Sequence, residues 1–435
     1  MNAAFFFNIG HPTTVQTSLV ALASFARFDP SGRYVATGRI DGSAAIWDLE
    51  TRSAIRILDG HVKAVSSLDW SRHSRFVLTT SKDWNVIIWD LANRCIPAQR
   101  HSTLRFDAPV VSASFHPRNS QIILALLTTG EAFIVDQRKA HRSRVELCEM
   151  LDESDEEAGG SSARVRSAIT IARFDPSGKH VYMGTTNGQI LVFNTRTKTM
   201  VARYKITGAG ALKGLEFTQN GRYLVSNSAD RTLRQFTVPV HPIPAPDSQF
   251  IDQELEPMHR FNDPINKTAW HAMSYSPDGE WLAGGKPTES FCCFFDDSNG
   301  ALDGGREPLM HLHWHPSKSA IASTTNHGNI LIWHRPHPER WGAFAGGFEE
   351  LDENVEYQER EDEFDIEDEA DMIRRKMKEE EQEVDVDTVV VTKPRHGQLH
   401  GVVTEDEDLV WAEEDPDEDV EEWIMQPVME EDWDS

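Results

Sequence analysis

The sequence predicts an all-β fold, a propeller of seven four-stranded blades followed by a long acidic carboxyl-terminal tail. The main observation is a pair of marks that recurs seven times: an aromatic residue before a turn, then a second, usually aromatic residue 19 or 20 positions later. The first marks are Phe28, Trp70, Phe115, Phe174, Phe217, Tyr275 and Trp314. The second marks are Trp47, Trp89, Val135, Phe193, Phe236, Phe295 and Trp333. Successive first marks lie 39 to 59 residues apart, so insertions fall between constant cores, as in repeat proteins.

The first repeat shows what is repeated. It alternates turns with short apolar or β-branched runs, which are Leu22–Phe28, Tyr34–Thr37, Ala45–Asp48 and Ala54–Leu58. The turns contain Asp-Pro-Ser-Gly or Asp-Gly, in which proline presets φ and glycine supplies the positive φ of a chain reversal. Four strands per repeat, the period and the closing Trp-Asp of the first two repeats are typical of WD40 blades.

The last repeat lacks a fourth strand of its own. It ends at Trp333 and His334, and the next residues, Arg335–Pro338, form a proline-containing turn. A closed ring leaves few sheet edges exposed, so another segment must complete this blade. We expect the amino-terminal run Phe5–Ile9 or Val15–Leu19 to supply the strand, which makes residues 1–340 the propeller domain.

The second repeat carries a polar set, His61, Ser81, Asp83 and Trp89. A Ser, a His and an Asp could form a hydrolase triad. At these positions in a blade, a buried hydrogen-bond chain that ends at the Trp89 indole is the favoured interpretation, because a buried indole N–H needs an acceptor. We therefore expect a structural network and no catalytic residues.

Charge divides the chain into two parts. Residues 349–435 contain 36 Asp and Glu against 7 Lys and Arg, whereas residues 1–348 are close to neutral. Such acidic blocks repel one another and have little apolar area to offset the entropy of ordering, so we expect a largely disordered tail. Its aromatic residues suit folding on a basic, grooved partner, and a merely solubilising tail is the alternative.

At residues 341–369 the chain resembles a known family. The runs Trp341–Ala345 and Phe348–Glu369 are similar to the signature segment of the retinoblastoma-binding protein five family, which includes the fungal WD40 subunit of COMPASS, a histone H3 lysine-4 methyltransferase complex. The resemblance implies a non-catalytic, nuclear scaffold that activates a SET domain together with an SPRY-domain subunit. It implies a partner-binding segment over residues 341–390 and leaves residues 391–435 as an acidic, disordered tail.

The resemblance also assigns residues to partners. It implies contact with the SET domain by Trp341, Phe344, Phe348, Leu351 and Val355. It implies binding of the SPRY subunit by Glu356, Tyr357, Glu359, Glu361, Asp362, Glu363, Phe364 and Ile366. A second WD-repeat subunit would dock on Val384, Asp385 and Val386, although Asp387 before Thr388 departs from the expected pattern.

Four cations are expected at one end of the ring, because blade-entry connections and second turns lie on the same face. They are Arg231, Lys267, Lys286 and Arg306. Such a cluster can bind nucleic-acid phosphates, and the resemblance implies that these belong to nucleosomal DNA; four ordinary solvated cations are the alternative.

The remaining sequence features argue against a metalloprotein, a membrane protein and a secreted protein. The four cysteines lack metal-ligand spacing, and we expect His311, His313 and His315 to be structural, so neither a metal nor a cofactor is expected. No apolar run is long enough for a membrane span, and no signal peptide is recognised. The run Arg374–Lys378 is a weak nuclear import signal, and Ser154 among acids is a weak phosphorylation candidate.

Two functions remain open at this point. The first is the COMPASS scaffold that the resemblance implies. The second is another chromatin WD40 adaptor, such as a histone chaperone subunit or a ubiquitin-ligase substrate receptor, which would bind its partner on the ring.

Overall fold

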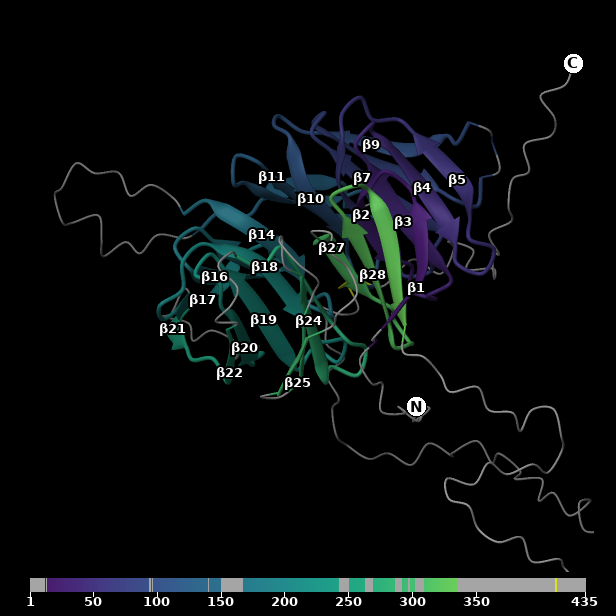
Figure 1. Ribbon diagram of the computed structural model, residues 1–435. Coiled ribbons are helices and arrows are strands. Elements are labelled where there is room, and N and C mark those ends of the chain that lie inside the picture. Colours follow the sequence, from purple (N-terminus) through teal and green to yellow (C-terminus); the bar gives the residue numbers. More distant parts are fainter. Residues whose placement is uncertain are drawn as a thin grey trace, which may run out of the picture. The chain divides into compact units, whose positions relative to one another are not determined.

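The described strands of the computed structural model form seven sheets, one for each repeat (Figure 1). The structure describes residues 12, 14–93, 95, 97–139, 141–149, 167–241, 250–262, 269–285, 292–295, 298–301, 309–334 and 411–412, with only the backbone given for 292–295 and 298–301. All of these belong to the compact unit of Met1–Pro336 and Asp406–Ser435; the second unit is His337–Glu405. The predicted WD40 propeller fold is confirmed.

Each blade contains four antiparallel strands, which are consecutive along the chain except in blade seven, where β1 (Thr14–Val20) takes part, and blade five, where β21 (Ile251–Leu255) precedes β22 (His259–Phe261). Blades one to three contain β2 (Ala23–Phe28), β3 (Tyr34–Arg39), β4 (Ser43–Asp48), β5 (Ser53–Asp59); β6 (Val65–Trp70), β7 (Phe76–Ser81), β8 (Asn85–Asp90), β9 (Arg100–Arg105); and β10 (Val110–Phe115), β11 (Ile122–Leu127), β12 (Ala132–Asp136), β13 (Ser143–Glu146). Blades four and five contain β14 (Ile169–Phe174), β15 (His180–Thr185), β16 (Gln189–Asn194), β17 (Met200–Ile206); and β18 (Leu212–Phe217), β19 (Tyr223–Ser228), β20 (Leu233–Thr237), β22 (His259–Phe261). Blades six and seven contain β23 (Ala272–Tyr275), β24 (Trp281–Gly285), β25 (Cys292–Phe295), β26 (Ser298–Ala301); and β27 (Leu309–Trp314), β28 (Ala320–Thr325), β29 (Asn329–His334), β1 (Thr14–Val20).

Strand pairing explains the constant spacing of the two marks. Phe28 is the last residue of β2 and pairs with Val35 on β3, which in turn pairs with Trp47 on β4. The same register joins Trp70, Val77 and Trp89 in the second blade. The two marks therefore lie two strands apart in one row of the sheet, and two hairpins of nearly constant length separate them along the chain.

The amino-terminal strand β1 completes the seventh blade. It pairs antiparallel with β29, from Thr14 opposite His334 to Val20 opposite Asn329. In Figure 1 this purple strand lies with the green strands of the last repeat. Of the two candidate segments, Val15–Leu19 is the donor, whereas Phe5–Ile9 lies outside the described residues.

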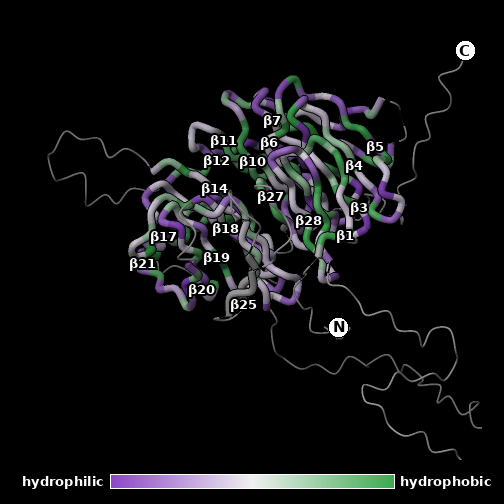
Figure 2. Tube along the Cα trace, viewed as in Figure 1, coloured by the Kyte–Doolittle hydropathy of each residue, from purple (hydrophilic) through white to green (hydrophobic). Residues whose placement is uncertain are grey.

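The inner strands β2, β6, β10, β14, β18, β23 and β27 contact one another in this order, and β27 returns to β2. Seven apolar clusters fill the spaces between neighbouring blades, for example Tyr34 and Ile46 of blade one against Leu68 and Trp89 of blade two. Figure 2 shows the hydrophobic residues concentrated along the strands. Each fully buried large side chain contributes about 1.5–3 kcal/mol, so the interfaces between blades hold the ring together.

One strand departs from the repeat pattern. After β20 the chain forms β21 (Ile251–Leu255), which pairs in parallel with β17, so blade four has five strands. The strand covers the outer edge of that blade, which would otherwise expose unpaired backbone groups. Among the described residues no helix is long and apolar enough to cross a membrane.

Candidate functional site

The polar set of the second blade forms a buried chain of hydrogen bonds. The Trp89 indole donates from Nε1 to Thr79 Oγ1 at 2.9 Å, and Thr79 Oγ1 lies 2.9 Å from His61 Nε2. On the other side of the His61 imidazole, Nδ1 lies 3.0 Å from Asp83 Oδ2. The carboxylate also accepts the backbone N–H groups of Val62 and Asn85. The network thus links the connection before β6, which carries His61, to the turn between β7 and β8, which carries Asp83.

Ser81 is not a link in this chain. Its hydroxyl donates to the carbonyl of Lys63 at 2.7 Å, and it accepts the backbone N–H of Asp83. Thr79 lies two residues earlier on the same strand face and takes the position for which Ser81 was predicted. The sequence carried a signal for Thr79. Thr37, Thr79 and Ser323 each lie ten residues before a tryptophan, and each hydroxyl accepts the indole N–H of that tryptophan.

The protonation of this network is structural. Burial lowers the pKa of His61, which favours a neutral ring that donates to Asp83 and accepts from Thr79. Burial alone raises the pKa of Asp83, but hydrogen bonds from Asn85, Val62 and His61 outweigh it and the net pKa is lowered. Because both ring nitrogens of His61 are engaged and Ser81 bonds elsewhere, this set has no nucleophile activated by a base.

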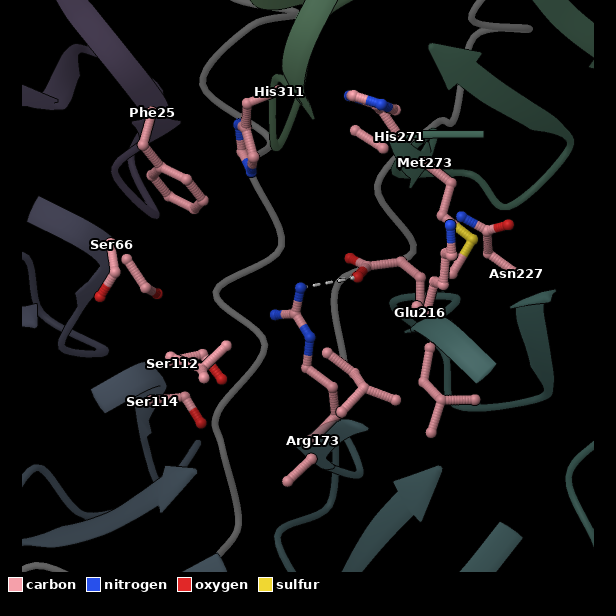
Figure 3. A pocket seen from close by; sticks show the side chains of 18 of the residues that line it. Phe25, Ser66, Ser112, Ser114, Arg173, Glu216, Asn227, His271, Met273 and His311 are labelled. Carbon is pink, nitrogen blue, oxygen red and sulfur yellow. Dashed lines mark ion pairs between the residues drawn. The ribbon is translucent and has the colours of Figure 1, made fainter. Parts of the chain in front are cut away.

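The inner strands surround a channel, shown in Figure 3, whose cavity measures about 180 Å³ and whose lining mixes polar and apolar side chains. Arg173 and Glu216 line it and form an ion pair at 3.3 Å, and the lining residue Arg27 forms another with Asp69 at 3.0 Å. Each lining arginine has a neighbouring carboxylate, and the exposed Lys213 adds a further cation to the lining.

Three histidines of the seventh repeat pack on the first blade. The His311 ring packs against Phe25 with centroids 3.7 Å apart and planes tilted by 39°, and His313 Nδ1 accepts the backbone N–H of Phe28. Burial lowers the pKa of His311 to about 3, so its ring is neutral. Within the described part of the chain, no three His, Cys, Asp or Glu side chains are arranged to hold a metal ion.

Of the four predicted nucleosome-facing cations, only Arg231 is among the described residues. It is exposed in the turn between β19 and β20, with φ of 70°, and its carbonyl accepts Nε1–H of Trp270 at 3.1 Å. Lys267, Lys286 and Arg306 lie outside the described residues. The backbone position of this turn is thus set by Trp270, which sequence reasoning had not singled out.

The partner-binding residues predicted in the tail cannot be located in the structure. The residues assigned to the SET domain, the SPRY subunit and the WD-repeat subunit all fall between residues 335 and 410, outside the described residues. Ser154 and Arg374–Lys378 are also outside the described residues. In the tail the structure describes Trp411 and Ala412 alone.

Comparison with known proteins agrees with the repeat analysis. A family model described as WD domain, G-beta repeat matches residues 6–48, 52–90 and 201–237. These ranges include β1, the strands of the first blade, β6 to β8 of the second blade and β18 to β20 of the fifth.

Two curated relatives are similar over most of their length. The retinoblastoma-binding protein 5 homolog of Drosophila melanogaster is 35% identical over 402 residues, covering 88% of this chain and 76% of the relative. The Set1 complex component swd1 of Schizosaccharomyces pombe is 33% identical over 369 residues, covering 83% of this chain and 88% of the relative.

A solved structure has the same fold. The β-propeller domain of Cps50 (Swd1) from Myceliophteria thermophila superimposes with a TM-score of 0.65 at 30% identity and covers 75% of this chain and all of that domain.

Proposed function

Because the chain belongs to the family of retinoblastoma-binding protein 5 and Swd1, we propose that it is a non-catalytic subunit of a COMPASS-type complex that methylates histone H3 at lysine 4. The observation that carries this proposal is the extent of the similarity. An alignment over 88% of the chain includes about 380 of its 435 residues, more than the propeller contains. The similarity therefore extends into the tail, where WD40 repeats alone would not produce it.

The proposed division of labour follows from the physical character of the two parts. The propeller is a closed, rigid ring held by apolar interfaces and gives the complex a fixed platform. The segment 341–367 alternates aromatic or aliphatic anchors with carboxylates. Such a segment gains its contacts by ordering on partner surfaces, with anchors such as Tyr357 and Phe364 filling apolar sites and acids such as Glu361 meeting basic ones.

We propose that this segment orders the SET domain together with the SPRY subunit, and that Val384–Val386 docks on a second WD-repeat subunit. Arg231, with Lys267, Lys286 and Arg306, would contact DNA phosphates of the nucleosome. The exposure of Arg231 supports the last contact. The chain would act in the nucleus.

Reconstitution tests the proposal. The full chain is combined with a SET-domain protein and an SPRY subunit, and methylation of histone H3 is measured with and without it. Replacing residues 341–367 by a Gly-Ser segment of equal length should abolish stimulation of the rate. The matched control, Trp423→Ala with Trp433→Ala, changes aromatic residues of the tail outside the proposed segment and should keep it.

The same experiment separates the two functions. If stimulation persists after replacement of residues 341–367, the scaffold function is wrong and an adaptor that binds through the ring becomes the better explanation. Charge reversal at Arg231, Lys267, Lys286 and Arg306 tests the DNA contact; nucleosome binding that stays unchanged in an assembled complex contradicts it.

A further inference from the structure

The turn between the second and third strands of a blade needs a residue with positive φ. Four of the described turns of this kind have glycine there, with φ between 73° and 96°: Gly42, Gly130, Gly188 and Gly328. Blade two has Trp84 at the same position, with φ of 74°. A residue with a Cβ is strained in this conformation, and such strain persists where another demand on the residue outweighs it. The side chain is 40% exposed, so the strained turn holds a large apolar ring at the protein surface.

Val62 lies beside this tryptophan. The carboxylate of Asp83, the residue before Trp84, accepts the backbone N–H of Val62 at 3.1 Å. On the other side, the carbonyl of Trp84 accepts the backbone N–H of Phe106 at 2.9 Å. Both backbone positions are thus fixed, yet the side chain of Val62 is 86% exposed. The hydrogen bonds of the second blade therefore hold two neighbouring apolar side chains at the surface.

Two more exposed apolar residues continue the patch onto blade one. The turn that carries Ile40 packs on the connection that carries Val62, because a Cβ on Gly42 would lie 2.5 Å from a carbonyl oxygen of that connection. Leu22 and Ile40 flank the first residue pair of β2 and β3, and they are 63% and 68% exposed. Leu22 also has positive φ, 52°. Contiguous apolar side chains on the surface of a folded protein mark interaction sites.

Charge at the rim of this patch is positive. Lys63 and Lys82 adjoin the two blade-two members of the patch in the sequence, and both are exposed. Within the part of the chain that the structure describes, neither lysine forms an ion pair. The carboxylates of the same two turns are already engaged, since Asp41 accepts two hydrogen bonds within its own turn and Asp83 is bonded to His61. The lysines are therefore available to carboxylates of a partner, and such rim charges steer association.

We propose that the four apolar residues and the two lysines form a docking surface for a short acidic segment of another protein. We call it the Trp84 surface; it consists of Leu22, Ile40, Val62, Trp84, Lys63 and Lys82. The partner segment carries two or more large apolar side chains among carboxylates. The apolar side chains cover the Trp84 ring, because tryptophan offers a large contact area and is enriched among the residues that dominate binding. The inference goes beyond the proposed function and does not depend on it.

Selection from a peptide library tests the chemistry of the partner. The full chain is used to select from a phage library of short random peptides. The enriched peptides should be negatively charged and should contain at least two large apolar residues, since these complement the lysines and the apolar patch. Enrichment of positively charged or wholly polar peptides would overturn the proposal.

The best enriched peptide is then synthesised with a fluorescein label, and its binding to variants of the full chain is followed by fluorescence anisotropy. Trp84→Gly and Val62→Glu should each weaken binding about tenfold or more. Val240→Glu is the matched control and should leave binding unchanged, because Val240 is 90% exposed and follows β20, at the opposite end of its blade from the second turn. Lys63→Glu with Lys82→Glu should weaken binding several-fold and remove most of its dependence on salt.

Thermal unfolding separates binding from folding. Trp84→Gly supplies the residue that four other turns of this kind have, so its unfolding midpoint should equal or exceed that of the wild-type chain. A lower midpoint would assign Trp84 a structural role in the blade and overturn the proposal. Equal peptide affinity for wild-type and Trp84→Gly chains would also overturn it. So would self-association of the wild-type chain that disappears in Trp84→Gly, or enrichment of peptides that match this chain's own tail, because the occupant would then be a copy or a part of this chain.

Discussion

His315 of the seventh blade donates from Nε2 to the carbonyl of Gly32 in the first blade at 3.0 Å. The bond connects residues 283 positions apart at the junction where the ring closes. His116 makes the same bond to Gly178 at 2.9 Å between blades three and four. In both rings Nδ1 accepts a backbone N–H two residues later, so each histidine is held in its neutral form with the proton on Nε2.

The stability of the protein should fall as pH falls from about 6.5 to 4. Burial lowers the pKa of His116 and of His315 to about 4 each. The unfolded chain binds protons at higher pH than the folded one, so this stability is present above pH 6.5 and is lost on acidification. At pH 5 the loss should be roughly 2 kcal/mol for each histidine.

Urea unfolding at pH 7 and pH 5 measures the predicted loss of stability on acidification. The difference between the two unfolding free energies should shrink in a chain carrying His116→Gln and His315→Gln. An unchanged difference would assign the acid sensitivity to other groups.

Gly32→Ala should destabilise the ring by about 3 kcal/mol, since it adds a steric clash to backbone strain. Gly32 has φ of 79°, and a Cβ there would lie 2.3 Å from Cε1 of His315. Gly208→Ala is the matched control because φ is 71° and nothing lies within 4 Å of the added Cβ. It isolates the backbone strain and should cost about 1 kcal/mol. Equal losses in urea unfolding would show that the histidine moves aside freely.

Thr79→Val should destabilise the second blade by about 3 kcal/mol, because it leaves the Trp89 indole N–H and His61 Nε2 buried without partners. Thr37→Val in the first blade is the comparison. Thr37 accepts a single, longer bond of 3.3 Å from Trp47, so its loss should cost about 1 kcal/mol. Urea denaturation of both variants measures the two costs, and a smaller loss for Thr79→Val than for Thr37→Val contradicts the network.

Leu19→Asp should weaken closure of the ring, whereas Val20→Asp should not. Both residues lie on β1, but Leu19 is 8% exposed within the cluster between blades seven and one, and Val20 is 78% exposed. Placing a carboxylate in that cluster should lower the unfolding free energy by about 3 kcal/mol, against about 0.5 kcal/mol or less at the surface. Thermal unfolding of the two variants at pH 7 provides the comparison, and equal midpoints would argue against closure by β1.

Some contacts could not be read from the sequence for physical reasons. Thr79 and Ser81 share one face of the same strand, so strand periodicity does not separate them, and the ten-residue spacing of Thr79 from Trp89 is the signal that does. The parallel pairing of β21 with β17 uses backbone atoms, which leave no side-chain pattern in the sequence. The contact of Arg138 with Trp411 joins residues that no local period relates.

The amino-acid sequence by itself determined the seven repeats, their four strands and the need for an outside strand in the last blade, because hairpin pairing is local and places the marks at a constant spacing. Only the tertiary structure decided which amino-terminal segment closes the ring and where Trp411 packs. These choices depend on surfaces that exist only after distant blades have packed together.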